Sequence, residues 1–136
     1  MKKRTAITGA VVTALTVGTS MAVLPSAAQA AYACRASEVC LYQDWGLKGS
    51  TRVFRDLAPG NGIADFRFYT YTNGANLNDS VSSIYNRAPY PVYVYEDGGF
   101  STGRKLMKIN AGQIVDFNIH TALPNDVASS MGMVSR

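Results

Sequence analysis

Short runs of alternating apolar and polar residues fill most of the chain after residue 37, and turn-forming residues separate them. A period of two is typical of half-buried β-strands. No apolar pattern of period 3.6 continues for ten residues, which favours an all-β protein. The runs predict strands at 39–43, 52–55, 65–72, 83–86, 92–95, 105–108, 112–117 and 131–134.

The predicted strands fall into two halves with the same plan. A linker at 87–91, whose two prolines disfavour regular strand pairing, separates the halves. We therefore expect two Greek-key motifs, at about 38–87 and 92–135, that form a sandwich of two four-stranded antiparallel sheets.

The first 30 residues have the pattern of a secretory signal peptide. A basic start at 2–4 precedes an apolar stretch at 6–24, and residues 28–30 read Ala-Gln-Ala, a small-x-small cleavage site. We expect cleavage of 1–30, a secreted single domain at 31–136, and no membrane span after cleavage. A chain of that length can bury a modest core without help.

Removal of this segment changes the charge of the protein. The full chain carries 13 Lys and Arg residues against 9 Asp and Glu residues, with a pI near 9.2. Three of the basic residues belong to the segment 1–30, so the mature domain has 10 basic and 9 acidic side chains. This balance argues against nucleic acid as a partner.

One polar hexapeptide occurs in both halves. Residues 78–83 read Asn-Asp-Ser-Val-Ser-Ser, residues 125–130 read Asn-Asp-Val-Ala-Ser-Ser, and each copy runs into a predicted strand. Each copy offers carboxylate, hydroxyl and amide oxygens but neither His nor Cys, a donor set that suits Ca²⁺ better than Zn²⁺. A single copy would indicate only a turn; two copies in equivalent positions favour a metal-binding role.

The two cysteines, Cys34 and Cys40, lie six positions apart in the expected mature chain. In an oxidising compartment we expect them to form a disulfide that stabilises the fold by about 2 kcal/mol on the chain-entropy model. The alternative is a redox or metal pair, but the spacing is not Cys-x-x-Cys and the sequence has no second pair.

These motifs resemble those of the microbial, calcium-binding βγ-crystallin family over residues 38–135. In that family each Greek key opens with an aromatic residue, four residues, an aromatic, one residue and Gly, and later carries Asn/Asp-Asn/Asp-x-x-Ser/Thr-Ser. Both hexapeptides fit the second pattern at every position. The opening pattern differs once in each half, because Leu47 replaces an aromatic and Gly103 falls one residue late.

The resemblance implies two Ca²⁺ sites between the paired loops. Each loop would contribute the carbonyl of its third residue and the hydroxyl of its fifth, and the carbonyl after the first aromatic would complete the set. The second residue of each loop would reach across to the site of the other loop. The implied ligands are Gln43, Ser80 and Ser82 from the first half, Glu96, Val127 and Ser129 from the second, and the carboxylates of Asp79 and Asp126. One carboxylate per ion predicts a moderate affinity, with calcium used for stability and not for signalling.

Catalytic residues are not apparent in the sequence. His120 is the single histidine and lies in a loop with Asn118 and Thr121. Nothing in the spacing supplies a nucleophile or an orienting acid for it. We therefore expect a protein that is not an enzyme, with His120 as a solvated loop residue.

An aromatic run at 65–72, in which Arg67 separates two phenylalanines, resembles a ligand-binding surface. Aromatic and Arg side chains can stack on bases or sugar rings, but a strand with both faces partly covered has the same pattern, and we favour the strand. The run lies where the first half is longer: 36 positions separate its first aromatic from its hexapeptide, against 30 in the second half. The extra length is a candidate functional loop.

Three functions from different classes fit these features, and a fold alone does not choose among them. The first, which we favour, is a secreted structural or stress protein stabilised by calcium. The second is a proteinase inhibitor, since a family of secreted bacterial metalloproteinase inhibitors has a crystallin-like fold; the loop closed by Cys34 and Cys40 would then enter the protease. The third is a binder of carbohydrate or of the cell envelope, with Trp45 and 69–71 as candidate stacking residues. We expect a monomer whose partners are calcium ions and, for the last two functions, a secreted protease or a glycan.

Overall fold

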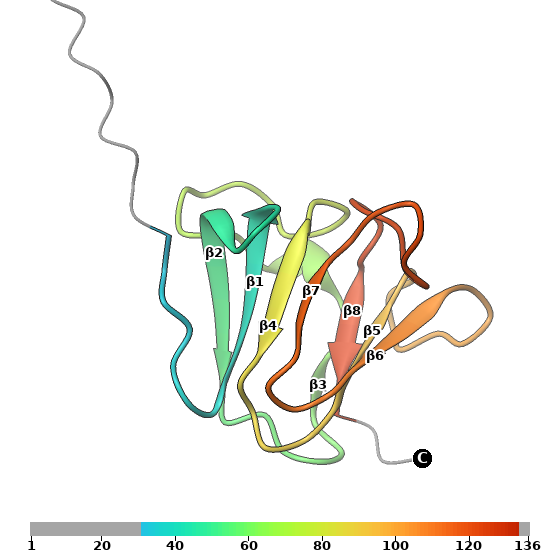
Figure 1. The fold of residues 1–136 in the computed structure, drawn as a ribbon. Coiled ribbons are helices and arrows are strands. Elements are labelled where there is room, and N and C mark those ends of the chain that lie inside the picture. Colours follow the sequence, from blue (N-terminus) through green and yellow to red (C-terminus); the bar gives the residue numbers. More distant parts are fainter. Residues whose placement is uncertain (1–30, 134–136) are drawn as a thin grey trace, which may run out of the picture.

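The computed structural model describes residues 31–133, and the predicted signal peptide lies outside them. Within this range the chain forms eight strands and one 3₁₀ turn, arranged as two packed sheets (Figure 1). The elements are β1 (Glu38–Asp44), β2 (Lys48–Arg55), β3 (Gly62–Ile63), the 3₁₀ turn η1 (Phe66–Phe68), β4 (Ser83–Asn86), β5 (Val92–Tyr95), β6 (Leu106–Ile109), β7 (Ile114–Asp116) and β8 (Ser130–Gly132).

Each sheet has four strands, in the orders β2-β1-β4-β7 and β3-β8-β5-β6, and every pair is antiparallel. The predicted all-β sandwich is therefore confirmed. The two halves of the chain exchange one strand: β7 from the second half completes the first sheet, and β3 from the first half completes the second. Neither half forms its own sheet alone, so the two halves must dock for either sheet to be complete.

Strand β1 is buried on both faces because it lies inside a sheet that is covered on both sides. Val39 and Leu41 point into the core between the sheets, whereas Cys40 and Tyr42 pack on the outer face. The segment that begins at Tyr32 covers this outer face. This explains why β1 has a continuous run of buried residues rather than a buried-exposed alternation.

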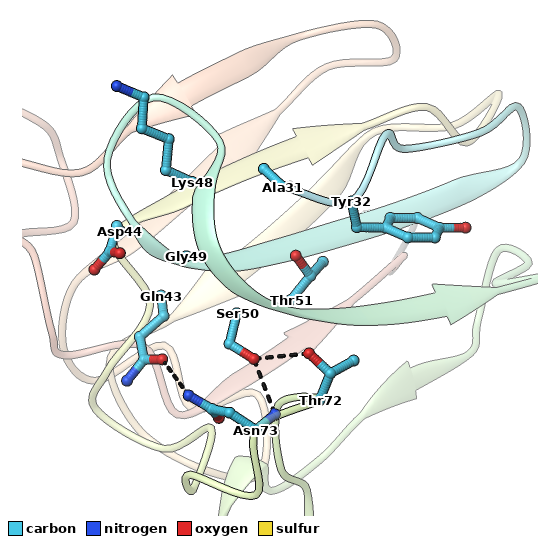
Figure 2. Close-up of a pocket in the computed structure, with 10 residues that line it drawn as sticks. All are labelled: Ala31, Tyr32, Gln43, Asp44, Lys48, Gly49, Ser50, Thr51, Thr72 and Asn73. Atoms are coloured by element: carbon cyan, nitrogen blue, oxygen red, sulfur yellow. Dashed lines mark hydrogen bonds between the residues drawn. The ribbon is translucent and has the colours of Figure 1, made fainter. Parts of the chain in front are cut away.

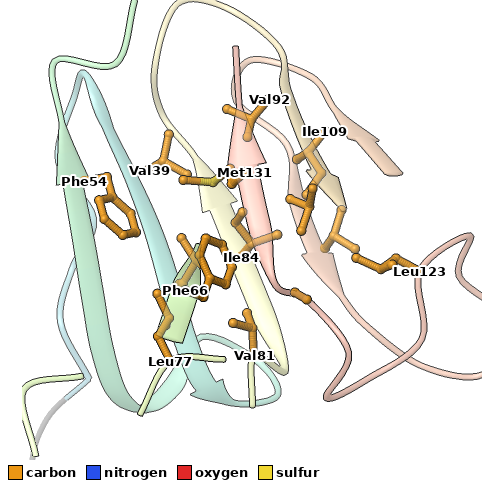
Figure 3. Close-up of a cluster of buried hydrophobic side chains, with 14 of the residues drawn as sticks. Val39, Phe54, Phe66, Leu77, Val81, Ile84, Val92, Ile109, Leu123 and Met131 are labelled. Atoms are coloured by element: carbon orange, nitrogen blue, oxygen red, sulfur yellow. The ribbon is translucent and has the colours of Figure 1, made fainter. Parts of the chain in front are cut away.

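The core between the sheets is built from aliphatic and aromatic side chains of both halves (Figure 3). Phe66 from η1 and Leu77 and Val81 from the loop before β4 point into the same cluster as side chains of the strands. The strand residues labelled in that view are Val39, Phe54, Ile84, Val92, Ile109 and Met131.

The prediction of a strand at 65–72 is wrong, because this segment contains the turn η1. The Asp65 side chain caps the turn by accepting a hydrogen bond from the Arg67 N–H at 2.9 Å. In a strand, Phe66 and Phe68 would share one face; in the turn, Phe66 is fully buried and Phe68 is 81% exposed. The third strand of the first half is instead the two-residue β3, which precedes this turn.

Candidate functional site

The two hexapeptides lie side by side and are joined by a symmetric pair of backbone hydrogen bonds. The Asp79 N–H donates to the Ala128 carbonyl at 3.1 Å, and the Asp126 N–H donates to the Val81 carbonyl at 3.5 Å. In both bonds the second residue of one loop meets the fourth residue of the other. The structure thus pairs the two motifs, as the resemblance to the βγ-crystallin family implied.

Each hexapeptide has the same local conformation. Asp79 and Asp126 both adopt a positive φ, of 52° and 56°, which Asp tolerates better than most residues. The preceding side chains, Asn78 and Asn125, donate to these carboxylates at 2.6 and 2.7 Å. The side-chain amide therefore orients the carboxylate in the same way in both copies.

The last serine of each hexapeptide fixes a β-hairpin beside the loop. Ser83 Oγ donates to the Asp44 carbonyl at 2.7 Å and accepts from the Leu47 N–H at 3.1 Å. Ser130 repeats both contacts on the β5–β6 hairpin and donates to Asp97 at 2.6 Å. Both serines are fully buried. The two hairpin tips are thus held alike, although their sequences depart from the family pattern at different positions.

One cavity beside the loops gathers the ligands implied for the first metal site. It has a volume of about 410 Å³ and contains Gln43, Ser80, Ser82 and Asp126 from that set, together with the carboxylates of Asp44 and Asp79. All these groups supply oxygen, the donor that a hard cation such as Ca²⁺ prefers. The residues present therefore fit Ca²⁺, which would be held by carboxylate, hydroxyl and carbonyl oxygens and would tie the two loops together.

The buried Tyr71 orients one of these ligands. Its hydroxyl donates to the Ser80 carbonyl at 3.0 Å, and burial raises the pKa of Tyr71 to about 12. The hydroxyl therefore stays protonated at neutral pH and keeps the bond. The Ser80 hydroxyl donates to the Asn76 carbonyl at 2.8 Å, so the Ser80 carbonyl is the oxygen expected to face a metal ion.

Two of the ligands implied for the second site are in direct contact. Ser129 Oγ donates to Asp79 Oδ1 at 3.0 Å, so these two predicted ligands do meet. Glu96 and Val127 are not among the residues that line the adjacent cavity of about 250 Å³. Its lining residues are Asp65, Arg67, Asn78, Asp97, Gly98 and Ser129.

Two cations also reduce the negative charge around this second cavity. Arg67 lines it directly, and Arg104 lies 3.7 Å from the carboxylates of both Glu96 and Asp97. Neighbouring cations disfavour a further cation, more so where the site is shielded from water. The first site therefore has the better arrangement for Ca²⁺.

Three acidic residues near the loops were missed in the sequence. Asp44 lines the first cavity, and Asp65 and Asp97 line the second. Asp44 and Asp97 hold equivalent positions, two residues after Tyr42 and Tyr95, so an alignment of the two halves carries the signal for this pair. Asp65 has a counterpart as well, because Asp65-Phe66 matches Asp116-Phe117 of the second half and both phenylalanines are fully buried.

The cysteines form the predicted disulfide, with an S–S distance of 2.04 Å and Cα atoms 5.9 Å apart. The loop that it closes exposes only Arg35, Ala36 and Ser37. It is fixed from within by the buried Glu38 carboxylate, which accepts from the Arg35 N–H at 2.8 Å. The predicted inhibitory loop is therefore rigid, but it exposes no large apolar side chain.

Glu38 anchors the amino-terminal segment to the first sheet. Its carboxylate also accepts from the Tyr32 hydroxyl at 3.0 Å and from Arg55 Nε at 2.8 Å. Burial alone raises the pKa of Glu38, but the hydrogen bonds from Arg35, Tyr32 and Arg55 outweigh it, so the pKa is lowered from its ordinary value. The carboxylate is therefore charged and fully engaged at neutral pH.

A further cavity lies beside the β1–β2 hairpin (Figure 2) and has a volume of about 680 Å³. Hydroxyl and amide groups line it: Asn73 Nδ2 donates to Gln43 at 2.9 Å, and the Ser50 and Thr72 hydroxyls are 2.7 Å apart. The Thr51 hydroxyl, among its lining residues, is buried without a partner within residues 31–133. These groups are polar and mostly bonded to one another.

The residues considered for stacking on a glycan do not form a common platform. Tyr71 is 3% exposed, and Tyr69 packs edge to face on Phe54 with ring centres 5.3 Å apart. Only Trp45, at 57% exposure, is open to solvent, and its Nε1 donates to Asn125. His120 is exposed in its loop, as expected.

Two four-stranded Greek-key sheets with paired loops define a βγ-crystallin-like fold, and two solved structures share it. One, described under the evolution of the eye lens βγ-crystallin domain fold, has 24% sequence identity and a TM-score of 0.57, covering 74% of this chain and 88% of that one. The other is a βγ-crystallin from Ciona intestinalis, with 21% identity and a TM-score of 0.52, covering 70% of this chain and 96% of that one.

The sequence profile of peptidase inhibitor family I36 matches residues 27–106, more than half of the chain, and the chain belongs to this family. Among proteins with curated descriptions, none matches it. Membership in an inhibitor family favours a binding protein over an enzyme. Within residues 31–133, no helix is long and apolar enough to cross a membrane.

Proposed function

We propose that this protein is a secreted inhibitor of endopeptidases, and of metalloendopeptidases in the first instance. The observation that carries the proposal is the match to peptidase inhibitor family I36 over residues 27–106. The crystallin-like fold agrees with it, because the secreted bacterial metalloproteinase inhibitors that this chain resembles have such a fold. The inhibitor function thus has better support than the purely structural role that the paired loops favoured in the sequence.

The physical properties of the fold support a binding role. The loops are fixed before any partner binds. The disulfide and the hydrogen bonds of the buried Glu38 hold the amino-terminal loop, and the hydroxyls of Ser83 and Ser130 hold the two hairpin tips. Preorganised loops lose less conformational entropy on association, which favours tight binding. Inhibitors that work in this way bind with little change in their backbone.

The test is an inhibition panel with purified residues 31–136. Metallo-, serine, cysteine and aspartic endopeptidases are titrated with the protein, and calcium is kept in excess so that lost activity does not reflect removal of calcium from the enzyme. We expect stoichiometric, reversible inhibition of metalloendopeptidases and an inhibitor that remains intact by mass spectrometry. Full activity of every enzyme at equimolar inhibitor would contradict the proposal.

We further propose that the paired hexapeptide loops bind Ca²⁺. The cavity that holds Gln43, Ser80, Ser82 and Asp126 supports this second function, because all four ligands implied for one site line it. The second site should be weaker, since Arg67 and Arg104 lie beside it.

Isothermal titration with Ca²⁺ tests the metal sites separately from inhibition. Asp126→Asn removes one of the three carboxylates that line the first site but keeps a residue that tolerates positive φ, and we expect it to weaken the tighter binding event. Asp56→Asn is a matched control, since Asp56 is exposed, lies outside the cavity and also has a positive φ, of 57°. Equal isotherms for wild type and Asp126→Asn would exclude this arrangement.

A further inference from the structure

The turn η1 presents one aromatic side chain to solvent on a fixed backbone. Phe68 is 81% exposed, whereas Phe66, two residues earlier, is fully buried in the core. A single exposed apolar side chain is ordinary on a protein surface and does not by itself indicate a partner. What distinguishes Phe68 is the number of contacts that hold the backbone on both sides of it.

On the amino-terminal side, the turn is held by Asp65 and by the core. The Asp65 carboxylate accepts from the Arg67 N–H at 2.9 Å and pairs with its guanidinium at 2.6 Å. The Phe66 N–H donates to the Ser129 carbonyl at 2.9 Å. The turn is thus attached to the second hexapeptide as well as to the core.

On the carboxyl-terminal side, the chain is held by the segment before the first hexapeptide. Asn76 Nδ2 donates to the Arg67 carbonyl at 2.9 Å, and the Leu77 N–H donates to the Tyr69 carbonyl at 3.0 Å. The Tyr69 ring packs against Phe54. Both peptide neighbours of Phe68 therefore have fixed positions, and the Phe68 side chain projects from a rigid base.

We propose that Phe68 is the anchor that enters an apolar specificity pocket of the target endopeptidase, one that accepts a large aromatic side chain. This inference rests on the proposed inhibitor function and names the contact surface and the kind of enzyme pocket. Aromatic anchors that fill a pocket dominate many protein interfaces. A rigid anchor binds more tightly than a mobile one, because less motion is lost on binding.

Two other exposed segments are weaker candidates for the anchor. The disulfide loop exposes Arg35, Ala36 and Ser37, none of which offers a large apolar group. Ile119 is 85% exposed but lies outside residues 27–106, the part of the chain that matches the inhibitor family. Phe68 lies inside the matched part of the chain.

The experiment measures inhibition constants of wild type, Phe68→Ala, Ile119→Ala and Arg35→Ala against a peptidase that the wild-type protein inhibits. The three variants change exposed side chains, so unfolding curves should coincide with that of wild type. We expect Phe68→Ala to raise the inhibition constant on the order of 30-fold or more, as hot-spot residues do. Ile119→Ala and Arg35→Ala should change it less than about threefold. Phe68→Tyr should retain most of the inhibition if a pocket for aromatic side chains receives residue 68.

A second arm compares enzymes of different specificity. Wild-type protein should inhibit endopeptidases that cleave beside large apolar residues and leave those specific for basic residues active. If wild type inhibits but Phe68→Ala inhibits equally well, or if Arg35→Ala alone loses activity, the anchor is elsewhere while the proposed function stands. If wild type inhibits no peptidase, the proposed function and this inference fail together.

Discussion

Removal of calcium should lower the thermal stability of this protein, because the proposed ions join two loops that only the folded state brings together. Asp79 and Asp126 belong to different halves of the chain, yet their N–H groups bond to the opposite loop. In the unfolded chain these loops separate, and the cavity that contains Asp126, Ser80 and Ser82 no longer exists. Calcium would therefore bind the native state and hardly bind the unfolded state.

The size of the effect follows from this linkage. A ligand that binds only the native state stabilises it by RT ln(1 + [L]/Kd), which is about 1.4 kcal/mol when its concentration is ten times Kd. Sites with few carboxylates in extracellular modules have Kd values on the order of 0.1 to 1 mM. If the first site lies at the tight end of that range, calcium at about 1 mM raises the melting temperature by roughly 6 to 11 °C. The second site, with Arg67 in its cavity, should add less.

Differential scanning calorimetry of residues 31–136 in calcium and in chelator measures this shift directly. Asp126→Asn should lose most of the shift, whereas Asp56→Asn should keep it. Magnesium should have a smaller effect, because it requires a tighter octahedral shell than carbonyl-rich loops provide. Coincident melts of the wild-type protein in calcium and in chelator would refute the reasoning and leave the hexapeptides as turns that dock the two halves.

Two further predictions concern the fold around the disulfide. Glu38→Gln should destabilise the protein at pH 7 by about 2 to 4 kcal/mol in urea unfolding, because the new amide places N–H groups against the donors of Arg35, Tyr32 or Arg55. The folded state lowers the pKa of Glu38, so the stability that its carboxylate contributes is present above the unfolded pKa near 4.5 and is lost as pH falls through the folded pKa. The difference in unfolding free energy between wild type and Glu38→Gln should therefore narrow in acid. A difference that stays constant with pH would contradict this role of the carboxylate. Replacing Cys34 and Cys40 together by Ser should cost about 2 kcal/mol; equal stability of oxidised and doubly substituted protein would show that the bridge adds nothing.

The sequence by itself predicted the sandwich and all but one of its strands, because these depend on local patterns that occur in both halves; the pairing of the hexapeptides was implied by the resemblance to a known family. Alternating apolar residues need a sheet to cover one face, so residues 83–86 and 92–95 were predicted with their observed bounds. The repeat of the Asn-Asp motif placed two like loops at equivalent points of two like halves. The six-residue spacing of Cys34 and Cys40 was likewise enough to predict their bridge.

Only the tertiary structure decided which strands share a sheet and what surrounds each loop. The exchange of β3 and β7 between halves depends on contacts between residues far apart in the chain, which no local pattern records. The turn at Phe66–Phe68 depends on the space that the core offers to Phe66 and on the cap from Asp65, so the alternating pattern there predicted the wrong element. The tertiary structure also places Asp44 in one cavity and Arg67 in the other, so two loops of nearly equal sequence have different charges around them.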